Sequence, residues 1–569
     1  MTATPWGFRD ILPEEAQARE EIALTVKGCF REHHYLPVET PLLEDKAALE
    51  EGGRMADTPF KLFDDDGRLL VVRPDNTLPI VRLVSTRMKA SDLPLRLRYE
   101  APVVREQQRG AGGSRQFTQL GFELIGEGGA AADTEMVSLV AEAMRALSLP
   151  QRKIVCGSVR PFKELLASCD DRALATDALA LVHANDFVGL DARVAESGEP
   201  VAVKAAISEL PRLHGGAEVL DRVDQLLAAA GVAGQLTAEL RDLVAGLPDE
   251  DADALSFDFS IMNSFDYYSG LVFKAYAGNL PDPVGSGGRY DSVFTGVFGD
   301  GAQVPAAGFA FSLERLEAAR NTAEDAGITG GDHALAHDAA APLRIAVPKG
   351  SLKADTLRVL ETAGIDVSEL RDPGRHLIVR GKDTRGDIGD IEFVIVRPSD
   401  APAFVGCGGA DCGICGRDSL IEADLNLLQL TDLNYGTCTF IEAEPAWRAG
   451  QAERNYARRG SLRVATKYPR IASAWYASRG VNVDIVSLHG NIELGPIVGM
   501  TDRIVDITAT GATLRDNDLV VTGKIMVCTA RFFVNPGAAR LDPRVRVLAD
   551  RLADAVKDLH FEPVAGSAQ

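Results

Sequence analysis

The sequence lacks the features that define several classes of protein. Its apolar residues never form the uninterrupted run of about 20 residues that a membrane-spanning helix needs. The first residues, MTATPWGFRDILPEEAQ, contain no basic stretch followed by an apolar core, so we expect no signal peptide. Cysteine is scarce, with 8 in 569 residues. This excludes a disulfide framework and predicts a cytoplasmic protein with reduced thiols.

Basic residues are too few for a protein that wraps nucleic acid. The 60 lysines and arginines stand against 82 aspartates and glutamates, which gives a net charge of −22. That sign is wrong for neutralising a phosphate backbone, so we expect neither a nucleic-acid nor a membrane partner. Small anionic substrates are not excluded, because local basic groups or backbone amides can receive them. The length predicts at least two or three domains of roughly 100–200 residues.

One segment has the composition of a linker. ITGGDHALAHDAAAP is rich in Gly, Ala and Asp, and it divides the protein at residues 326–342. In residues 1–325, strand-like runs such as LLVVRPDN, LRLRYEAPVVRE and GLVFKAYA alternate apolar and polar residues, which predicts an antiparallel sheet with flanking helices. In residues 343–569, short apolar strands such as LRIAVPKG, EFVIVRPSD, LRVATKYP and VDIVSLHG precede turns and helical stretches, which predicts an α/β fold.

The stretch DITATGATL, residues 506–514, is typical of a phosphate cradle. RIVDI predicts a strand and TATGAT a turn, in which Gly511 lets the backbone approach a ligand and the threonines offer hydroxyl groups. It lacks the lysine of the Walker loop. Asp506 is repelled by phosphate and suits sugar hydroxyls, so the loop suggests a ribose 5-phosphate. An ordinary strand connection is the alternative for such a turn taken alone.

Several separated motifs resemble the short form of ATP phosphoribosyltransferase over nearly all of residues 343–540. They include LRIAVPKG, VRPSDAPAFVGCGGADCGICGRDSLIE, DLNYGTC, LRVATKYPRIASAWY and LHGNIELGPIVGMTDRIVDITATGATLRDNDLVV. The resemblance implies a glycosyltransferase that joins ATP and phosphoribosyl pyrophosphate to give phosphoribosyl-ATP and pyrophosphate, the first step of histidine biosynthesis. It also implies a two-lobed α/β fold, like that of periplasmic binding proteins, with the active site in the cleft.

Charge arguments assign roles to the motif residues. Displacing pyrophosphate builds positive charge on the ribose, which carboxylates stabilise, while Mg²⁺ bound with the pyrophosphate substrate and nearby cations neutralise the leaving group. By motif position we expect Glu493 and Asp506 to be catalytic, with Asp502 a weaker candidate, and Ser351 stands where the family usually has Arg. The expected substrate-binding residues are Lys349, Lys467, Asp506, Thr508, Ala509, Thr510, Gly511, Ala512, Thr513 and Leu514.

The cysteines of the same half offer an alternative hypothesis. Cys407, Cys412 and Cys415 follow the C-x4-C-x2-C spacing of plant-type iron–sulfur proteins, and Cys438 could supply a fourth ligand. An iron–sulfur or ligand-binding module is therefore one alternative. The competing interpretation is that the cysteines replace other small residues in a Gly-rich segment, as small buried hydrophobes.

The first half resembles a class II aminoacyl-tRNA synthetase. RLRYEAPVVREQQRGAGGSRQFTQLGFELIG is similar to motif 2, GSGGRYDSVF with AAGFAFSLERL to the motif 3 region, and NSFDYYSG to a histidyl-tRNA synthetase signature. A histidine-activating enzyme is therefore the second alternative. Asn263 stands where the synthetases have an Arg that neutralises the reacting groups, and no anticodon-binding domain follows, so we do not expect tRNA charging.

The resemblance of this half is nearest to the regulatory subunit that accompanies the short-form transferase. It implies a histidine pocket and a chain in which regulator and catalyst are fused. Since only a short stretch follows KIMVCTARFFVNP, the C-terminal regulatory domain of the long form is expected to be missing, and we expect histidine to inhibit through the first half. Both families imply a homo-oligomer. The expected histidine-binding residues are Asp75, Thr77, Arg105, Gln119, Glu123, Tyr267 and Tyr268.

Overall fold

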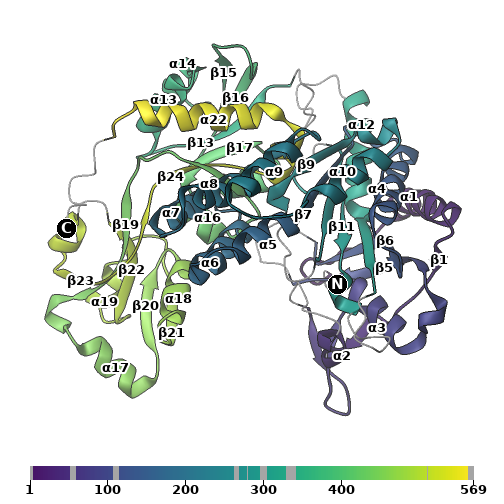
Figure 1. The fold of residues 1–569 in the computed structure, drawn as a ribbon. Helices are drawn as coiled ribbons and strands as arrows, with labels where there is room; N and C mark the ends of the chain where they lie inside the picture. Colours follow the sequence, from purple (N-terminus) through teal and green to yellow (C-terminus); the bar gives the residue numbers. More distant parts are fainter. Residues whose placement is uncertain are drawn as a thin grey trace. The chain divides into compact units, whose positions relative to one another are not determined.

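The chain divides into two compact units, residues 1–337 and 338–569 (Figure 1). The computed structural model describes residues 4–51, 59–106, 114–261, 268–278, 280–294, 304–328, 341–508 and 511–561. Most of the expected linker at 326–342 lies outside these ranges. Within them, no helix combines the length and the apolar character required to cross a bilayer.

In the described part of the first unit, nine strands form one sheet in the order β1-β5-β6-β12-β11-β10-β7-β9-β8. Neighbours pair antiparallel, apart from the parallel pairs β1–β5 and β7–β9 near the edges. The predicted antiparallel sheet is confirmed. Its strands are β1 (Leu36–Pro37), β5 (Leu95–Val104), β6 (Gln116–Ile125), β7 (Lys153–Ser158), β8 (His214–Gly215), β9 (Leu255–Asp258), β10 (Leu271–Tyr276), β11 (Gly285–Arg289) and β12 (Ala306–Ser312).

A smaller sheet holds one of the expected strands. The run LLVVRPDN does not enter the large sheet, since its apolar part forms β4, which pairs with β2 and β3 instead. The three strands are β2 (Leu43–Asp45), β3 (Lys61–Phe63) and β4 (Leu69–Val72). The turn that follows β4 leads into α3 (Thr77–Arg87) and so brings the RPDN segment beside the large sheet.

Helices flank the large sheet, as the sequence predicts. The long helix α1 starts at a proline and has two glutamates in its first turn, both of which favour a helix N-terminus. It packs against α4 and α12. The helices are α1 (Pro13–Glu32), α2 (Lys46–Glu51), α4 (Ala130–Ala146), α5 (Arg160–Ala167), α6 (Arg172–His183), α7 (Phe187–Glu196), α8 (Val201–Glu209), α9 (Val219–Ala229), α10 (Ala238–Gly246), α11 (Asp249–Ala252) and α12 (Leu313–Ile328).

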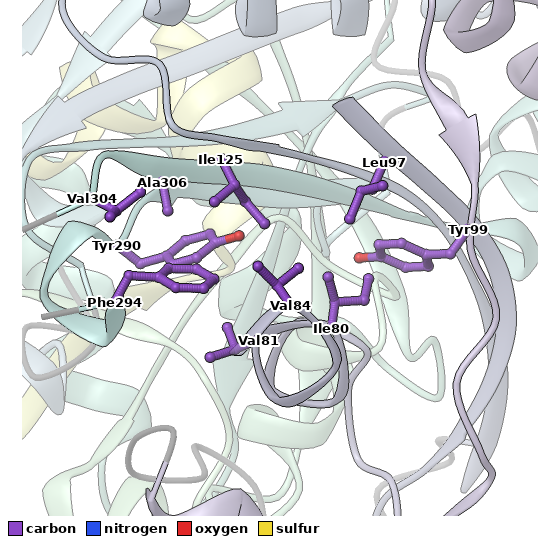
Figure 2. Close-up of a cluster of buried hydrophobic side chains, with 10 residues drawn as sticks. All are labelled: Ile80, Val81, Val84, Leu97, Tyr99, Ile125, Tyr290, Phe294, Val304 and Ala306. Atoms are coloured by element: carbon purple, nitrogen blue, oxygen red, sulfur yellow. The ribbon is translucent and has the colours of Figure 1, made fainter. Parts of the chain in front are cut away.

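A buried cluster joins α3 to the large sheet. The apolar face of α3 packs against side chains of β5, β6 and β12 and of the segment after β11. Two tyrosines enter this cluster from opposite sides, and Figure 2 shows their hydroxyl groups pointing inward, toward each other. The cluster consists of Ile80, Val81, Val84, Leu97, Tyr99, Ile125, Tyr290, Phe294, Val304 and Ala306.

The second unit has two lobes, each built on a mixed sheet, so the expected two-lobed α/β fold is confirmed. In the described residues, the first lobe has seven strands in the order β14-β15-β16-β13-β17-β24-β18, and the second has five in the order β21-β20-β22-β19-β23. The strands are β13 (Leu343–Pro348), β14 (Ile365–Asp366), β15 (Ile378–Asp383), β16 (Asp390–Val396), β17 (Cys412–Gly416), β18 (Leu428–Asp432), β19 (Cys438–Pro445), β20 (Leu462–Thr466), β21 (Val483–Ser487), β22 (Arg503–Thr508), β23 (Leu519–Cys528) and β24 (Ala530–Val534).

The chain passes from the first lobe to the second between β18 and β19, and it returns between β23 and β24. In the first lobe α13 lies against α22 (Figure 1). The first-lobe helices are α13 (Lys353–Thr362), α14 (Ser368–Arg371), α15 (Ala401–Gly406), α16 (Arg417–Ala423), α21 (Pro536–Leu541) and α22 (Pro543–Asp558). The second-lobe helices are α17 (Gln451–Arg459), α18 (Pro469–Ala477), α19 (Leu494–Ile497) and α20 (Ala512–Asp516).

Candidate functional site

Asp506 lies near the end of β22, a central strand of the second lobe. β22 pairs with β20 on one side and with β19 on the other, where Asp506 is opposite Ile441. After Thr508 the chain turns, and the Thr508 hydroxyl accepts a hydrogen bond of 3.0 Å from the Gly511 amide. Gly511 has φ +70°, in the left-handed region that favours glycine, and it caps the short helix α20. Strand, turn and helix start thus follow one another as predicted.

Asp506 lies within electrostatic range of two other residues predicted for the site, Glu493 and Lys467. The pKa of Asp506 is raised to about 6, mainly by burial and in part by the charge of Glu493. The Ile507 amide, which donates a hydrogen bond of 2.8 Å to the carboxylate, and the Lys467 ammonium lower it. The fold therefore brings Asp506, Glu493 and Lys467 together, although they come from three different segments of the sequence.

The other members of the turn differ in what they can offer to a ligand. The side chain of Thr513 is exposed, whereas that of Leu514 is 9% exposed and packs in a core cluster of the lobe with Ile504 and Leu519. Leu514 can therefore contribute its backbone, but its side chain is a core residue. Ala509 and Thr510 lie outside the described residues, and Ala512 is described for its backbone only.

Lys349 belongs to the first lobe. It follows β13, and its amide donates a hydrogen bond of 2.9 Å to the carbonyl oxygen of Val396 at the end of β16. Its side chain is exposed, as is that of Ser351. β13 runs parallel to β16 and β17, and the carboxyl ends of such strands are where α/β folds bind ligands. This position is consistent with a substrate contact from the first lobe.

Asp502, the weaker catalytic candidate, has a structural role. Its carboxylate accepts hydrogen bonds from Asn455 (2.6 Å) and from the Arg463 amide (2.9 Å), and it forms an ion pair with Arg459. The side chain is 6% exposed. A buried carboxylate held by three donors ties α17 to β20 and is not free to meet a sugar.

The cysteine geometry does not support an iron–sulfur site. Cys412 and Cys415 are buried three residues apart in β17, and such residues in a strand point to opposite faces of the sheet. Cys438 lies opposite Cys528 across β19 and β23, and their side chains contact each other. Within the described ranges, no group of three or more His, Cys, Asp or Glu residues is placed to hold a metal ion.

Sequence reasoning missed Asp418, which lies at the start of α16 near the expected catalytic residues. Burial raises the pKa of the Asp418 carboxyl, while the Lys467 ammonium and a hydrogen bond with the Tyr468 side chain lower it. Tyr468 in turn lies within electrostatic range of Asp506. The signal in the sequence was the acid in GRDSL, directly after a buried strand.

The first unit contains a buried polar centre at Glu123. This side chain of β6 is 1% exposed, and it accepts hydrogen bonds from Thr77 (3.1 Å), from Tyr99 (3.5 Å) and from Tyr290. The two tyrosine hydroxyls are those that Figure 2 shows pointing inward. A Cβ at Gly308 would lie 1.7 Å from the carboxylate, so this position requires glycine. Tyr99 and Tyr290 were missed, although both stand in the quoted motifs.

The other expected histidine-binding residues lie around Glu123. Asp75 interacts electrostatically with Glu123 and with Tyr268, and Arg105 also acts on Tyr268. Burial is the main cause that raises the pKa of Tyr268. The side-chain oxygen of Gln119, Oε1, accepts hydrogen bonds from the backbone amide and the side-chain amide of Asn76, at 3.2 and 2.8 Å. Tyr267 and Asn263 lie outside the described residues.

The protonation of Glu123 predicts a pH dependence of stability. Burial raises its pKa from 4.5 to about 8. Between these values the folded unit holds a proton that the unfolded chain has lost. The protonated Glu123 carboxyl therefore adds to the free energy of unfolding. Its contribution is complete below pH 4.5 and is lost as the pH rises to about 8. The loss is at most about 1.4 kcal/mol per pH unit. Melting curves across this range should show a smaller loss for Glu123→Gln, and equal losses would contradict the assignment.

Comparisons with known proteins separate the two units. A family described as "Histidyl-tRNA synthetase" matches residues 7–316, and one described as "ATP phosphoribosyltransferase" matches residues 397–557. The ATP phosphoribosyltransferase of Rubrobacter xylanophilus is 47% identical over 199 residues, which cover 35% of this chain and 89% of that protein. The ATP phosphoribosyltransferase regulatory subunit of Moorella thermoacetica is 35% identical over 347 residues, covering 60% of this chain and 87% of that protein.

A solved structure supports the assignment of the first unit. The ATP phosphoribosyltransferase regulatory subunit/histidyl-tRNA synthetase of Bacillus halodurans superposes with a TM-score of 0.51 at 27% sequence identity, covering 63% of this chain and 89% of that chain. The first family match spans more than half of the chain, and the catalytic relative is matched over most of its own length. The chain therefore belongs to the ATP phosphoribosyltransferase family, with a regulatory-subunit domain of the histidyl-tRNA synthetase type joined ahead of the catalytic domain.

Proposed function

We propose that this chain joins ATP and phosphoribosyl pyrophosphate to give phosphoribosyl-ATP and pyrophosphate, the first step of histidine biosynthesis. The observation that carries the proposal is the convergence of Asp506, Glu493 and Lys467 at the head of the turn 508–514, in the unit that belongs to the transferase family. Pyrophosphate should be released only when both substrates are present. Release from ATP and histidine alone would indicate synthetase chemistry and contradict the proposal.

The site chemistry follows from the charges that develop during the reaction. The adenine N1 already carries a lone pair, so its attack on the anomeric carbon needs no strong base. As pyrophosphate departs, the ribose becomes positive, and the ionised Asp506 beside Glu493 stabilises it. The turn amides and hydroxyls at 508–514 hold the 5-phosphate. Lys467 offsets the negative charge of the leaving pyrophosphate, and Lys349 offers a second cation from the first lobe.

Mg²⁺ is expected to enter bound to the pyrophosphate substrate and to neutralise part of its charge. The residues fit this, because Mg²⁺ usually keeps several waters and takes only one or two protein carboxylates together with substrate phosphates. Glu493 lies close enough to Asp506 for its charge to raise the pKa of the Asp506 carboxyl. Such a pair of oxygen donors suits a bound cation, and the site residues themselves bind, orient and stabilise the reacting sugar.

The pKa of Asp506 predicts a pH profile. Because only the carboxylate stabilises a cationic sugar, kcat/KM for phosphoribosyl pyrophosphate should fall as the pH drops below about 6. The fall should approach tenfold per pH unit, since one proton blocks the site. Initial rates measured across this range test the expectation. A profile that stays flat through pH 6 would show that Asp506 does not act as the ionised group.

The proposal extends to regulation by histidine. Glu123, Asp75 and Thr77 form an acidic and polar centre that suits an ammonium group, while Arg105 suits a carboxylate and Tyr268 with Gln119 an imidazole ring. Without a ligand, Glu123 is largely protonated at neutral pH, and a bound ammonium group would favour its carboxylate form. We expect histidine bound here to inhibit the transferase, and we expect the chain to work as a homo-oligomer.

A further inference from the structure

Helix α16 connects the two lobes of the catalytic unit. It follows β17 of the first lobe, and its Leu420 belongs to the core of that lobe. The next residue, Ile421, packs instead against the core of the second lobe, a cluster that includes Tyr468 and Ile471. The helix therefore has one side chain in each core. A shift of α16 would therefore disturb the packing of both cores.

The N-terminus of α18, in the second lobe, is capped by a residue of the first lobe. The residue at the cap position, Tyr468, makes no capping hydrogen bond with its side chain, and Pro469 follows it. The next two amides donate to the Glu422 carboxylate of α16, Arg470 at 3.2 Å and Ile471 at 2.7 Å. A carboxylate is favourable there because the first amides of a helix lack partners and carry partial positive charge.

Two further contacts join the same helices. The Arg470 guanidinium forms a salt bridge of 2.8 Å with Asp424, at side-chain exposures of 38% and 51%. Asp418, at the other end of α16, lies close enough to the Tyr468 side chain for this group to lower the pKa of its carboxyl, and the Tyr468 ring packs edge-on against Phe440. The exposed salt bridge contributes little because water screens it. The partly buried Glu422 contact is the one that fixes the start of α18.

This start of α18 carries Lys467. The lysine lies between Thr466, the last residue of β20, and Pro469, the first residue of α18. The Tyr468 amide donates a hydrogen bond of 2.8 Å to the Thr466 hydroxyl, which closes the turn on the strand side. Glu422 holds it on the helix side. The backbone of Lys467 is thus fixed from both ends, with its ammonium group near Asp506 and Asp418.

We propose that Glu422 is a positioning residue for the transferase reaction, which holds Lys467 beside Asp506 from the opposite lobe. This inference rests on the proposed function. Without the Glu422 carboxylate, the two amides of α18 lose their partner, and the turn before it is free to shift. A displacement of about 1 Å at a charged group that meets substrate costs up to roughly 100-fold in rate.

The test is a double-mutant cycle on the full chain. Glu422→Ala should lower kcat/KM for phosphoribosyl pyrophosphate by about 10- to 100-fold. Glu422→Gln keeps one acceptor oxygen, so its kcat/KM should fall less than that of the alanine variant. It replaces the alanine variant in the test if that protein does not fold. Asp424→Asn is the matched control, since it removes the charge of the exposed salt bridge between the same two helices and asparagine tolerates the left-handed backbone of this position. Its kcat/KM for phosphoribosyl pyrophosphate should stay within about twofold of that of the unmodified chain.

The decisive comparison uses Lys467→Ala. If Glu422 acts through Lys467, adding Glu422→Ala to Lys467→Ala should lower the rate by no more than about twofold further. A general loss of lobe stability would instead multiply the two single losses. Multiplied losses, or a Glu422 variant as active as the control, would overturn the inference while the unmodified chain remains active. An inactive unmodified chain would overturn the proposed function and this inference with it.

Discussion

Replacing Asp506 with Asn should lower the rate of phosphoribosyl-ATP formation by roughly 100- to 1,000-fold, the range seen when one preorganised electrostatic contact is removed from a transition state. The side chain keeps its size and can still accept the hydrogen bond of the Ile507 amide, so the turn should keep its shape. What is lost is the negative charge beside the developing cation. Initial rates followed by the ultraviolet absorbance of the product measure the effect, and the affinity for ATP should change little.

The matched control for this prediction is Asp516→Asn. Asp516 ends α20, only a few residues beyond the turn, and its side chain is exposed. The same substitution there should leave the rate within about twofold, since exposed charges are screened by water. If the Asp506→Asn protein were folded and as active as this control, the Asp506 carboxylate would take no part in the reaction.

The second large effect is expected in the regulatory unit. Glu123→Gln removes the carboxylate that a bound ammonium group would favour, so that in the bound state the hydroxyls of Tyr99 and Tyr290 donate to a neutral acceptor. A charge-assisted contact of this kind in a buried site should raise the histidine concentration for half inhibition by more than about tenfold. An allosteric coupling of typical size, about 1–3 kcal/mol, corresponds to a change of roughly 5- to 150-fold in apparent affinity.

Each variant's own rate without histidine serves as the reference in this experiment. Glu100→Gln is the control, because Glu100 lies in the neighbouring strand β5 with an exposed side chain that pairs with Lys27. It should keep the inhibition of the unmodified chain. If Glu123→Gln kept the same inhibition as this control, histidine would have to act at another site.

The sequence predicted the sheets and the turn because local signals determine them. Alternating polarity defined β5, short apolar runs defined β13 and β16, and the small residues after Asp506 required a turn. The convergence of Asp506 with Glu493 and Lys467 could be expected only through the family resemblance. Nothing local in the sequence reports that these distant segments meet. The pairing of β20 with β22 brings Lys467 beside Asp506, and Glu493 comes from the start of α19.

Contacts between distant segments account for what the sequence did not reveal. Asp502 precedes a strand and resembles a surface acid, yet its carboxylate is buried and pairs with Arg459 of α17. Leu514 stands within the ligand-facing motif, but α20 turns its side chain into the core. Glu422 follows an apolar pair in α16, and its role depends on the first turn of a helix nearly fifty positions later in the chain, as its sequence separations of 48 and 49 show.

The most direct test measures phosphoribosyl-ATP formation by the purified full chain from ATP and phosphoribosyl pyrophosphate, with and without millimolar histidine. We expect product only when both substrates are present, and a rate that histidine suppresses. A folded chain that makes no product, or one whose rate is unchanged by histidine, would contradict the claim that catalyst and regulator work together in this one chain.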